Sequence, residues 1–228
     1  MDQAEMNPAD LTLDELRLAL APAIADAAVF DGWTDEALVM AADQMGADVD
    51  VARLAFKGKG GGVSAMDMVS AWIETVDVAM AAALPPEKLA QMKIRERIRS
   101  LVQFRLDAVA GQEEALRRGL AIMSMPQNAA RAVKLGWNSA DVMWRLAGDT
   151  ATDYNHYTKR AILASIYGAT LAVFVDDQSE GKEDTRAFLD RRIEGVMTFE
   201  KVKAKWLGSE RESFSVTRFL GRLRYPAR

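Results

Sequence analysis

The feature that most constrains the fold is the spacing of apolar residues, which recur every three or four positions along most of the chain. Leu16, Leu20 and Ile24 show this spacing near the start. Leu189 and Ile193 show it near the end. Such spacing gathers apolar side chains on one face of an α-helix. No segment sustains the alternation typical of a β-strand. The sequence therefore predicts an all-α fold of about ten helices.

Capping residues, glycines and prolines divide the chain into individual helices. We expect them at about 14–30, 35–45, 47–56, 64–84, 87–110, 112–125, 129–135, 139–147, 155–175 and 183–199. Residues 161–175 are apolar around the whole helix, which indicates burial at the centre of a body or in an interface. The amphipathic helix that follows could complete a two-fold seam, so we predict a homodimer.

The first 62 residues form a distinct acidic segment, which we call the head. Its three predicted helices, with Gly46 between the second and third, make a helix-turn-helix pattern. The head has four basic and twelve acidic residues, a net charge of −8. The helix that would read DNA begins with Asp48 and Asp50, and DNA-binding proteins need lysine and arginine to neutralise phosphates. The shape therefore suggests DNA binding, and the charge argues against it.

A glycine-rich run, residues 57–62, separates the head from the rest of the chain. It lacks the pattern of a phosphate-binding loop, so we interpret it as a flexible connector. The sequence thus predicts a head at 1–62, a helical ligand-binding and dimerisation body at 63–200, and a basic amphipathic segment at 201–228.

Catalytic chemistry finds little support in the composition. The chain has no cysteine and a single histidine, His156. Asp153 and His156 have the spacing of a helical di-iron ligand pair, but a di-iron site needs a second such pair. A serine-histidine-aspartate triad lacks its usual motif as well. We predict no metal site, no catalytic residue and no enzymatic activity.

The body is rich in methionine and aromatic residues, which can line an adaptable apolar cavity or fill an ordinary core. The candidate lipid-binding residues are Trp72, Met80, Leu101, Phe104, Met123 and Trp144.

The last segment carries apolar residues at helical spacing with arginines around them. This pattern suits a membrane-surface helix and equally a terminal helix docked on its own domain. The candidate membrane-contact residues are Val216, Arg218, Phe219, Leu220, Arg222 and Leu223.

The stretch 143–167, MWRLAGDTATDYNHYTKRAILASIY, resembles the Coq-nine family of ubiquinone biosynthesis accessory proteins. Further similarity occurs at Gly32-Trp33-Thr34, at Pro126-Gln127-Asn128 and at 183–189. The resemblance implies a TetR-regulator-like fold, a homodimer and a cavity for isoprenoid lipid. It also implies a partner, the di-iron hydroxylase that acts late on the quinone ring, to which the lipid intermediate is presented.

Residues matching the family's partner-binding surface lie around this stretch, although relatives place tryptophan where this chain has His156. They are Asp141, Met143, Asp153, His156, Tyr157, Lys159 and Arg160. No cofactor is expected beyond a bound isoprenoid lipid, quinone or phospholipid. Acidic first residues and short apolar runs favour a bacterial cytoplasmic protein or a mature one, and we expect the bacterial cytoplasm, at the inner face of the cytoplasmic membrane. The alternative function is a TetR-like transcriptional regulator that binds DNA.

Overall fold

The computed structural model describes residues 7–150 and 154–210. Within these ranges all secondary-structure elements are helices, and the one β pairing is an isolated bridge between Lys57 and Val63. The predicted all-α fold is confirmed. None of the helices in the described part of the chain is long and apolar enough to cross a membrane.

Local capping signals set the boundaries of the head. After the short 3₁₀ turn η1 (Pro8–Asp10) come α1 (Leu13–Asp31), α2 (Asp35–Met45) and α3 (Val49–Ala55). The Thr34 hydroxyl caps α2 by accepting a hydrogen bond from the amide of Ala37. Gly46 ends α2 with φ of 69°, a left-handed conformation that favours glycine. These three helices have the predicted helix-turn-helix order.

The glycine-rich run after α3 is a closed turn and not the flexible connector that the sequence suggested. The amide of Gly58 donates to the carbonyl of Gly62 at 2.8 Å, and that of Ser64 to Phe56 at 2.9 Å. Gly61 has φ of 88°, which a side chain would oppose. These backbone hydrogen bonds fix the entry into the next helix.

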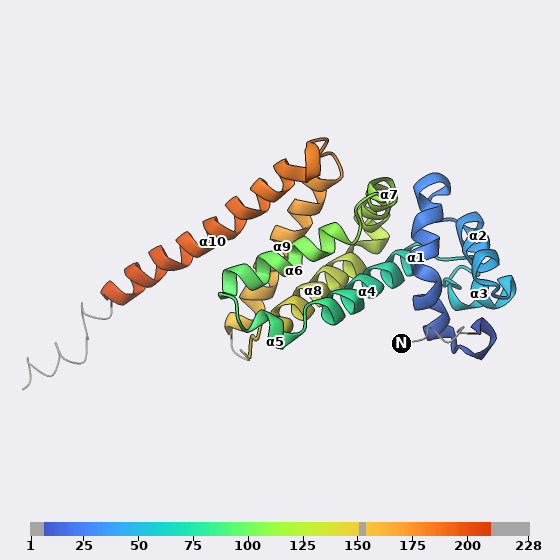
Figure 1. Cartoon of the computed structure of the whole chain (residues 1–228), viewed down its shortest axis with the longest axis horizontal. Helices are drawn as coiled ribbons and strands as arrows, with labels where there is room; N and C mark the ends of the chain where they lie inside the picture. Colours follow the sequence, from blue (N-terminus) through green and yellow to red (C-terminus); the bar gives the residue numbers. More distant parts are fainter. Residues whose placement is uncertain (1–6, 151–153, 211–228) are drawn as a thin grey trace, which may run out of the picture.

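The remaining helices form the body (Figure 1). In chain order they are α4 (Ala65–Ala83), α5 (Pro86–Leu89), α6 (Ile94–Asp107), α7 (Glu113–Ser124), η2 (Pro126–Asn128), α8 (Ala129–Leu146), α9 (Tyr154–Phe174), η3 (Glu180–Lys182) and α10 (Glu183–Glu210). Helices α4, α6, α8 and α9 pack on one another. Helix α10 packs on α9 and α6, and its C-terminal part extends past the other body helices (Figure 1).

Three predicted boundaries in the body are wrong. The helix expected at 87–110 divides at residues 90–93, where Glu96 accepts a hydrogen bond from the amide of Lys93 and starts α6. The helices expected at 129–135 and 139–147 are one helix, because α8 packs along α9 and α4 and tolerates Gly136. Helix α10 continues past Phe199 to Glu210. The candidate membrane-contact residues at 216–223 lie outside the described residues.

Head and body share one hydrophobic core, which runs from Leu16 to Ile193. The indole of Trp33 is 4% exposed and donates from Nε1 to the carbonyl of Ala115 in α7 at 2.9 Å. Its ring centroid lies 5.4 Å from that of Trp72 in α4. The predicted boundary at residue 62 therefore crosses a continuous core, and the division into domains stays a prediction.

Asp177 organises the turn between α9 and α10. One carboxylate oxygen accepts from the amide and hydroxyl of Ser179 at 2.8 and 2.6 Å. The other accepts from the amide and hydroxyl of Thr185 at 2.9 and 2.6 Å. Burial opposes the charge, but these hydrogen bonds outweigh it and hold the pKa of Asp177 well below its usual value. The carboxylate is thus a structural element of the turn.

Asp177→Asn should lower the free energy of unfolding at neutral pH by about 1–3 kcal/mol, because an amide nitrogen would face two of these donors. Since the folded pKa is depressed, the stabilisation is complete above the unfolded pKa of about 4 and is lost as pH falls below it. Urea denaturation from pH 7 to pH 3 measures both effects. The same loss of stability with falling pH in both proteins would contradict this assignment.

Candidate functional site

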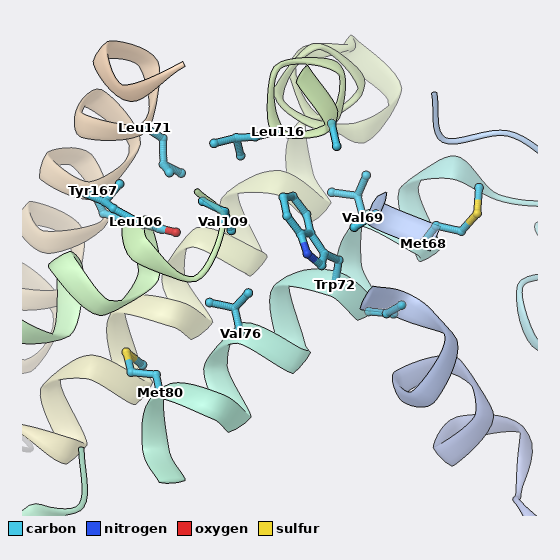
Figure 2. Close-up of a cluster of buried hydrophobic side chains, with 14 of the residues drawn as sticks. Met68, Val69, Trp72, Val76, Met80, Leu106, Val109, Leu116, Tyr167 and Leu171 are labelled. Carbon is cyan, nitrogen blue, oxygen red and sulfur yellow. The ribbon is translucent and has the colours of Figure 1, made fainter. Parts of the chain in front are cut away.

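A cavity of about 620 Å³ lies within the body, between α4, α7, α8 and α9 and the end of α6. Figure 2 shows Trp72 and Val76 of α4, Val109 after α6, and Leu116 of α7 around this space. Most lining side chains are aliphatic or aromatic. Ligand cavities of this size are typically apolar with few polar groups.

The cavity opens along α8 and α9, where the lining residues Val133, Ala161 and Gly168 are exposed. Gly136 and Gly168 both line it, and a Cβ atom added at either would meet no atom within 4 Å. Small residues on two facing helices therefore leave the space open.

The structure brings together two of the six candidate lipid-binding residues. Trp72 and Met123 line this cavity. Met80 and Leu101 are wholly buried elsewhere in the core, and Phe104 packs half-buried against it. These three therefore do not line the cavity, because their side chains fill contacts between helices.

Trp144 belongs to a second cavity of about 530 Å³, between α6, α8, α9 and α10. Its indole Nε1 donates to the carbonyl of Lys159 at 3.0 Å, and the Lys159 ammonium lies 5.4 Å from the ring. The wall of this second cavity also includes Ile162, Ile166 and Ile193.

A buried polar cluster adjoins the first cavity. Arg105 of α6 is 1% exposed and forms an ion pair with Asp77 of α4. It also donates to the Ser139 hydroxyl of α8 at 3.2 Å, and that hydroxyl lies 3.2 Å from the other Asp77 oxygen. Burial raises the pKa of Asp77 even though Arg105 opposes the shift. The sequence patterns single out neither Arg105 nor Asp77.

A second charged network holds α8 against α9. Arg160 is 2% exposed and contacts Asp141 at 2.5 Å and Asp149 at 3.0 Å. Lys159 also contacts Asp149, at 2.6 Å, and Arg145 contacts Asp141 at 2.8 Å. Three of these four contacts join α9 to α8 or to the turn that follows it, and the Arg145–Asp141 contact lies within α8.

This network changes the interpretation of the predicted partner-binding residues. Met143 is wholly buried and Arg160 nearly so, and neither side chain can meet a partner directly in this conformation. Tyr157 is 62% exposed, with its ring 6.0 Å from that of Trp137 and 5.1 Å from that of His156. Asp153 lies outside the described residues, and the partner-binding role of the set stays a prediction.

The head offers few free cations on the helix that would read DNA. Arg53 of α3 donates twice to Asp35, at 2.9 and 2.7 Å, and lies 3.5 Å from Asp50. Asp48 caps the same helix by accepting from the amides of Asp50 and Val51. Among the described residues no cluster of three or more potential ligands could hold a metal ion.

Comparison with known proteins places the chain in a family. Residues 129–200 match the COQ9 family model. A rat protein named ubiquinone biosynthesis protein COQ9, mitochondrial, is 33% identical over 173 residues, covering 73% of this chain. This chain belongs to the COQ9 family. The human COQ9 protein is 32% identical over 173 residues, again 73% of this chain. The aligned parts are 54% of the rat and 52% of the human protein, so the chain spans about half their length.

The fold is shared with a TetR transcriptional regulator from Nitrosomonas europaea. The TM-score is 0.60 at 23% identity, covering 78% of this chain and 95% of the regulator. This likeness confirms the predicted TetR-regulator-like fold for the COQ9 chain and concerns the fold alone.

The predicted location is wrong. COQ9 relatives from rat, human and cattle are named as mitochondrial proteins, which does not fit the bacterial cytoplasm or the inner face of its membrane. That prediction rested on acidic first residues and short apolar runs, which do not identify a compartment.

Proposed function

We propose that this chain is a non-catalytic accessory protein of ubiquinone biosynthesis. It holds a polyprenylated ring intermediate in the 620 Å³ cavity and presents it to the hydroxylase that acts on the ring. The apolar cavity, in a chain whose relatives are named ubiquinone biosynthesis proteins, is the observation that carries the proposal.

The physical need for such a protein follows from the ligand. Each CH₂ group removed from water contributes about 0.8 kcal/mol, so a polyprenyl chain does not cross water freely. A cavity of this volume matches a ligand of drug-like size. The cavity therefore suits the ring of the ligand and the first part of its polyprenyl chain.

The rim of the cavity suits presentation to a partner. Trp137 lines the cavity, and its ring packs on that of the exposed Tyr157. Tyr157 and the half-buried Lys159 are among the residues expected to bind the hydroxylase. Ligand and partner would therefore meet at the α8–α9 edge. We also propose that two copies of the chain form a homodimer through α9 and α10.

Gly168→Leu tests the cavity directly. The added side chain would occupy the open space, while leucine's higher helix propensity keeps α9 stable. We expect isoprenoid lipid recovered by organic extraction and mass spectrometry to fall about tenfold, a loss of about 1.4 kcal/mol in binding.

Gly195→Leu is the matched control, since Gly195 lies on α10, away from this cavity, and also has open space around its Cβ position. It should retain the lipid. Equal lipid content in both variants, or none in the unaltered protein, would count against the proposal.

DNA binding, the alternative function, is less well supported. The head has a net charge of −8, and Arg53 is already paired with two carboxylates. A protein that binds DNA needs such cations for phosphate contacts.

A further inference from the structure

One nitrogen of the buried Arg105 guanidinium has no hydrogen-bond acceptor in the described part of the chain. Nη1 pairs with Asp77 and Nη2 with Ser139, but Nε has no partner. Buried donors of this kind are almost always paired in native proteins, and an unpaired one calls for an explanation. A polar atom of a bound ligand would satisfy such a donor.

The side chain that carries this donor lines the cavity. Arg105, Ser139 and Tyr167 all line it, and they come from three different helices. The guanidinium carbon lies 4.8 Å from the centre of the Tyr167 ring, which limits how the side chain can move. Among the described lining residues Arg105 is the one with a charged side chain. A polar atom of a bound molecule would therefore find its donor at this place.

The surrounding charges define what kind of atom fits. Asp77 already faces Arg105, so the pair carries little net charge for an anion to neutralise. Burial acts to lower the pKa of Arg105, but charge and hydrogen-bond interactions with Tyr167 and Asp77 outweigh burial and raise it, so the guanidinium stays a donor. A neutral oxygen acceptor suits this environment better than a phosphate or a carboxylate. The aromatic wall of Trp72 and Trp137 suits a flat ring beside it.

We propose that Arg105 anchors the ring end of the ligand by donating its Nε hydrogen to an oxygen substituent on the ring. The anchor rests on the proposed function of the cavity and adds to it a basis for specificity. Arg105 selects oxygenated rings over plain hydrocarbons of the same size. The apolar walls then take the start of the isoprenoid chain. Asp77 and Ser139 are positioning residues, which hold the guanidinium in place.

Two probes test the anchor by equilibrium dialysis. One is a benzoquinone bearing a short isoprenoid chain, and the other is a benzene ring that bears the same chain but has no oxygen substituents. The unaltered protein should bind the quinone about tenfold more tightly, because a hydrogen bond from a charged donor is gained. In Arg105→Lys an ammonium still faces Asp77, but the Nε hydrogen is lost. This variant should bind both probes equally.

A second variant guards against a folding defect. Arg105→Met combined with Asp77→Leu removes the whole ion pair, which proteins often tolerate when the replacements are apolar and of similar size. It should also lose the preference for the quinone while keeping its affinity for the benzene probe. A preference that persists in both variants overturns the anchor and leaves the cavity intact. Failure of the unaltered protein to bind either probe overturns the proposed function itself.

Discussion

Arg160→Met is expected to lower the free energy of unfolding by about 3–5 kcal/mol, because it removes two buried hydrogen bonds between charged groups, each worth about 1.5–3 kcal/mol. Two carboxylates, Asp141 and Asp149, would lose their shared cation. The Asp149 side chain is 5% exposed, so water cannot replace the lost contact. Urea denaturation monitored by circular dichroism measures the change.

Arg145→Met is the matched control. Arg145 contacts the same Asp141, at 2.8 Å, but its side chain is 73% exposed. Exposed pairs contribute less than about 1 kcal/mol, so this variant should be nearly as stable as the unaltered protein. Equal destabilisation by the two substitutions would contradict a buried structural role for Arg160. If Arg160→Met destabilises the protein and Arg145→Met does not, any loss of partner binding in an Arg160 variant is explained by disturbed packing between α8 and α9.

Trp33→Ala should be about as costly, at about 3–5 kcal/mol. The indole is almost fully buried where the head meets α7, so its loss opens a cavity there. The carbonyl of Ala115 would also lose the side-chain hydrogen bond that reaches it from the head. Chemical denaturation gives the value, and hydrogen exchange should show faster opening of α1 and α7.

Phe30→Ala provides the comparison, since Phe30 also lies near the head–body junction but is 81% exposed. Its substitution should change stability by less than about 0.5 kcal/mol. A small effect at both positions would mean that the head does not depend on its contact with the body.

Much of the fold is predictable from short-range signals. The structure has α2 at the predicted residues, because Thr34 and Gly46 mark its two ends. The break before α6 is harder to foresee, since Lys93 is not a usual cap and the Glu96 side chain makes the closing hydrogen bond. The continuity of α8 depends on tertiary packing, which overrides the breaking tendency of Gly136.

The candidate site is less predictable, for a physical reason. Periodicity separates buried from exposed positions, but it does not tell a residue that fills the core from one that lines a cavity. Met80 and Trp72 both fit the pattern of buried apolar positions in the sequence, but of the two only Trp72 lines the cavity. Arg105 is even harder to identify from the sequence, because its burial depends on Asp77 and Ser139, which are 28 and 34 residues away.

The contact between Trp33 and Trp72 has a spectroscopic consequence. The two indoles are close and tilted by 46°, so their near-ultraviolet transitions couple and should give a distinct circular dichroism band. Trp72 lines the cavity and Trp33 belongs to the head, which makes the pair a built-in optical reporter of occupancy. A quinone bound beside Trp72 should quench its emission, so the filling of the cavity can be followed without a label.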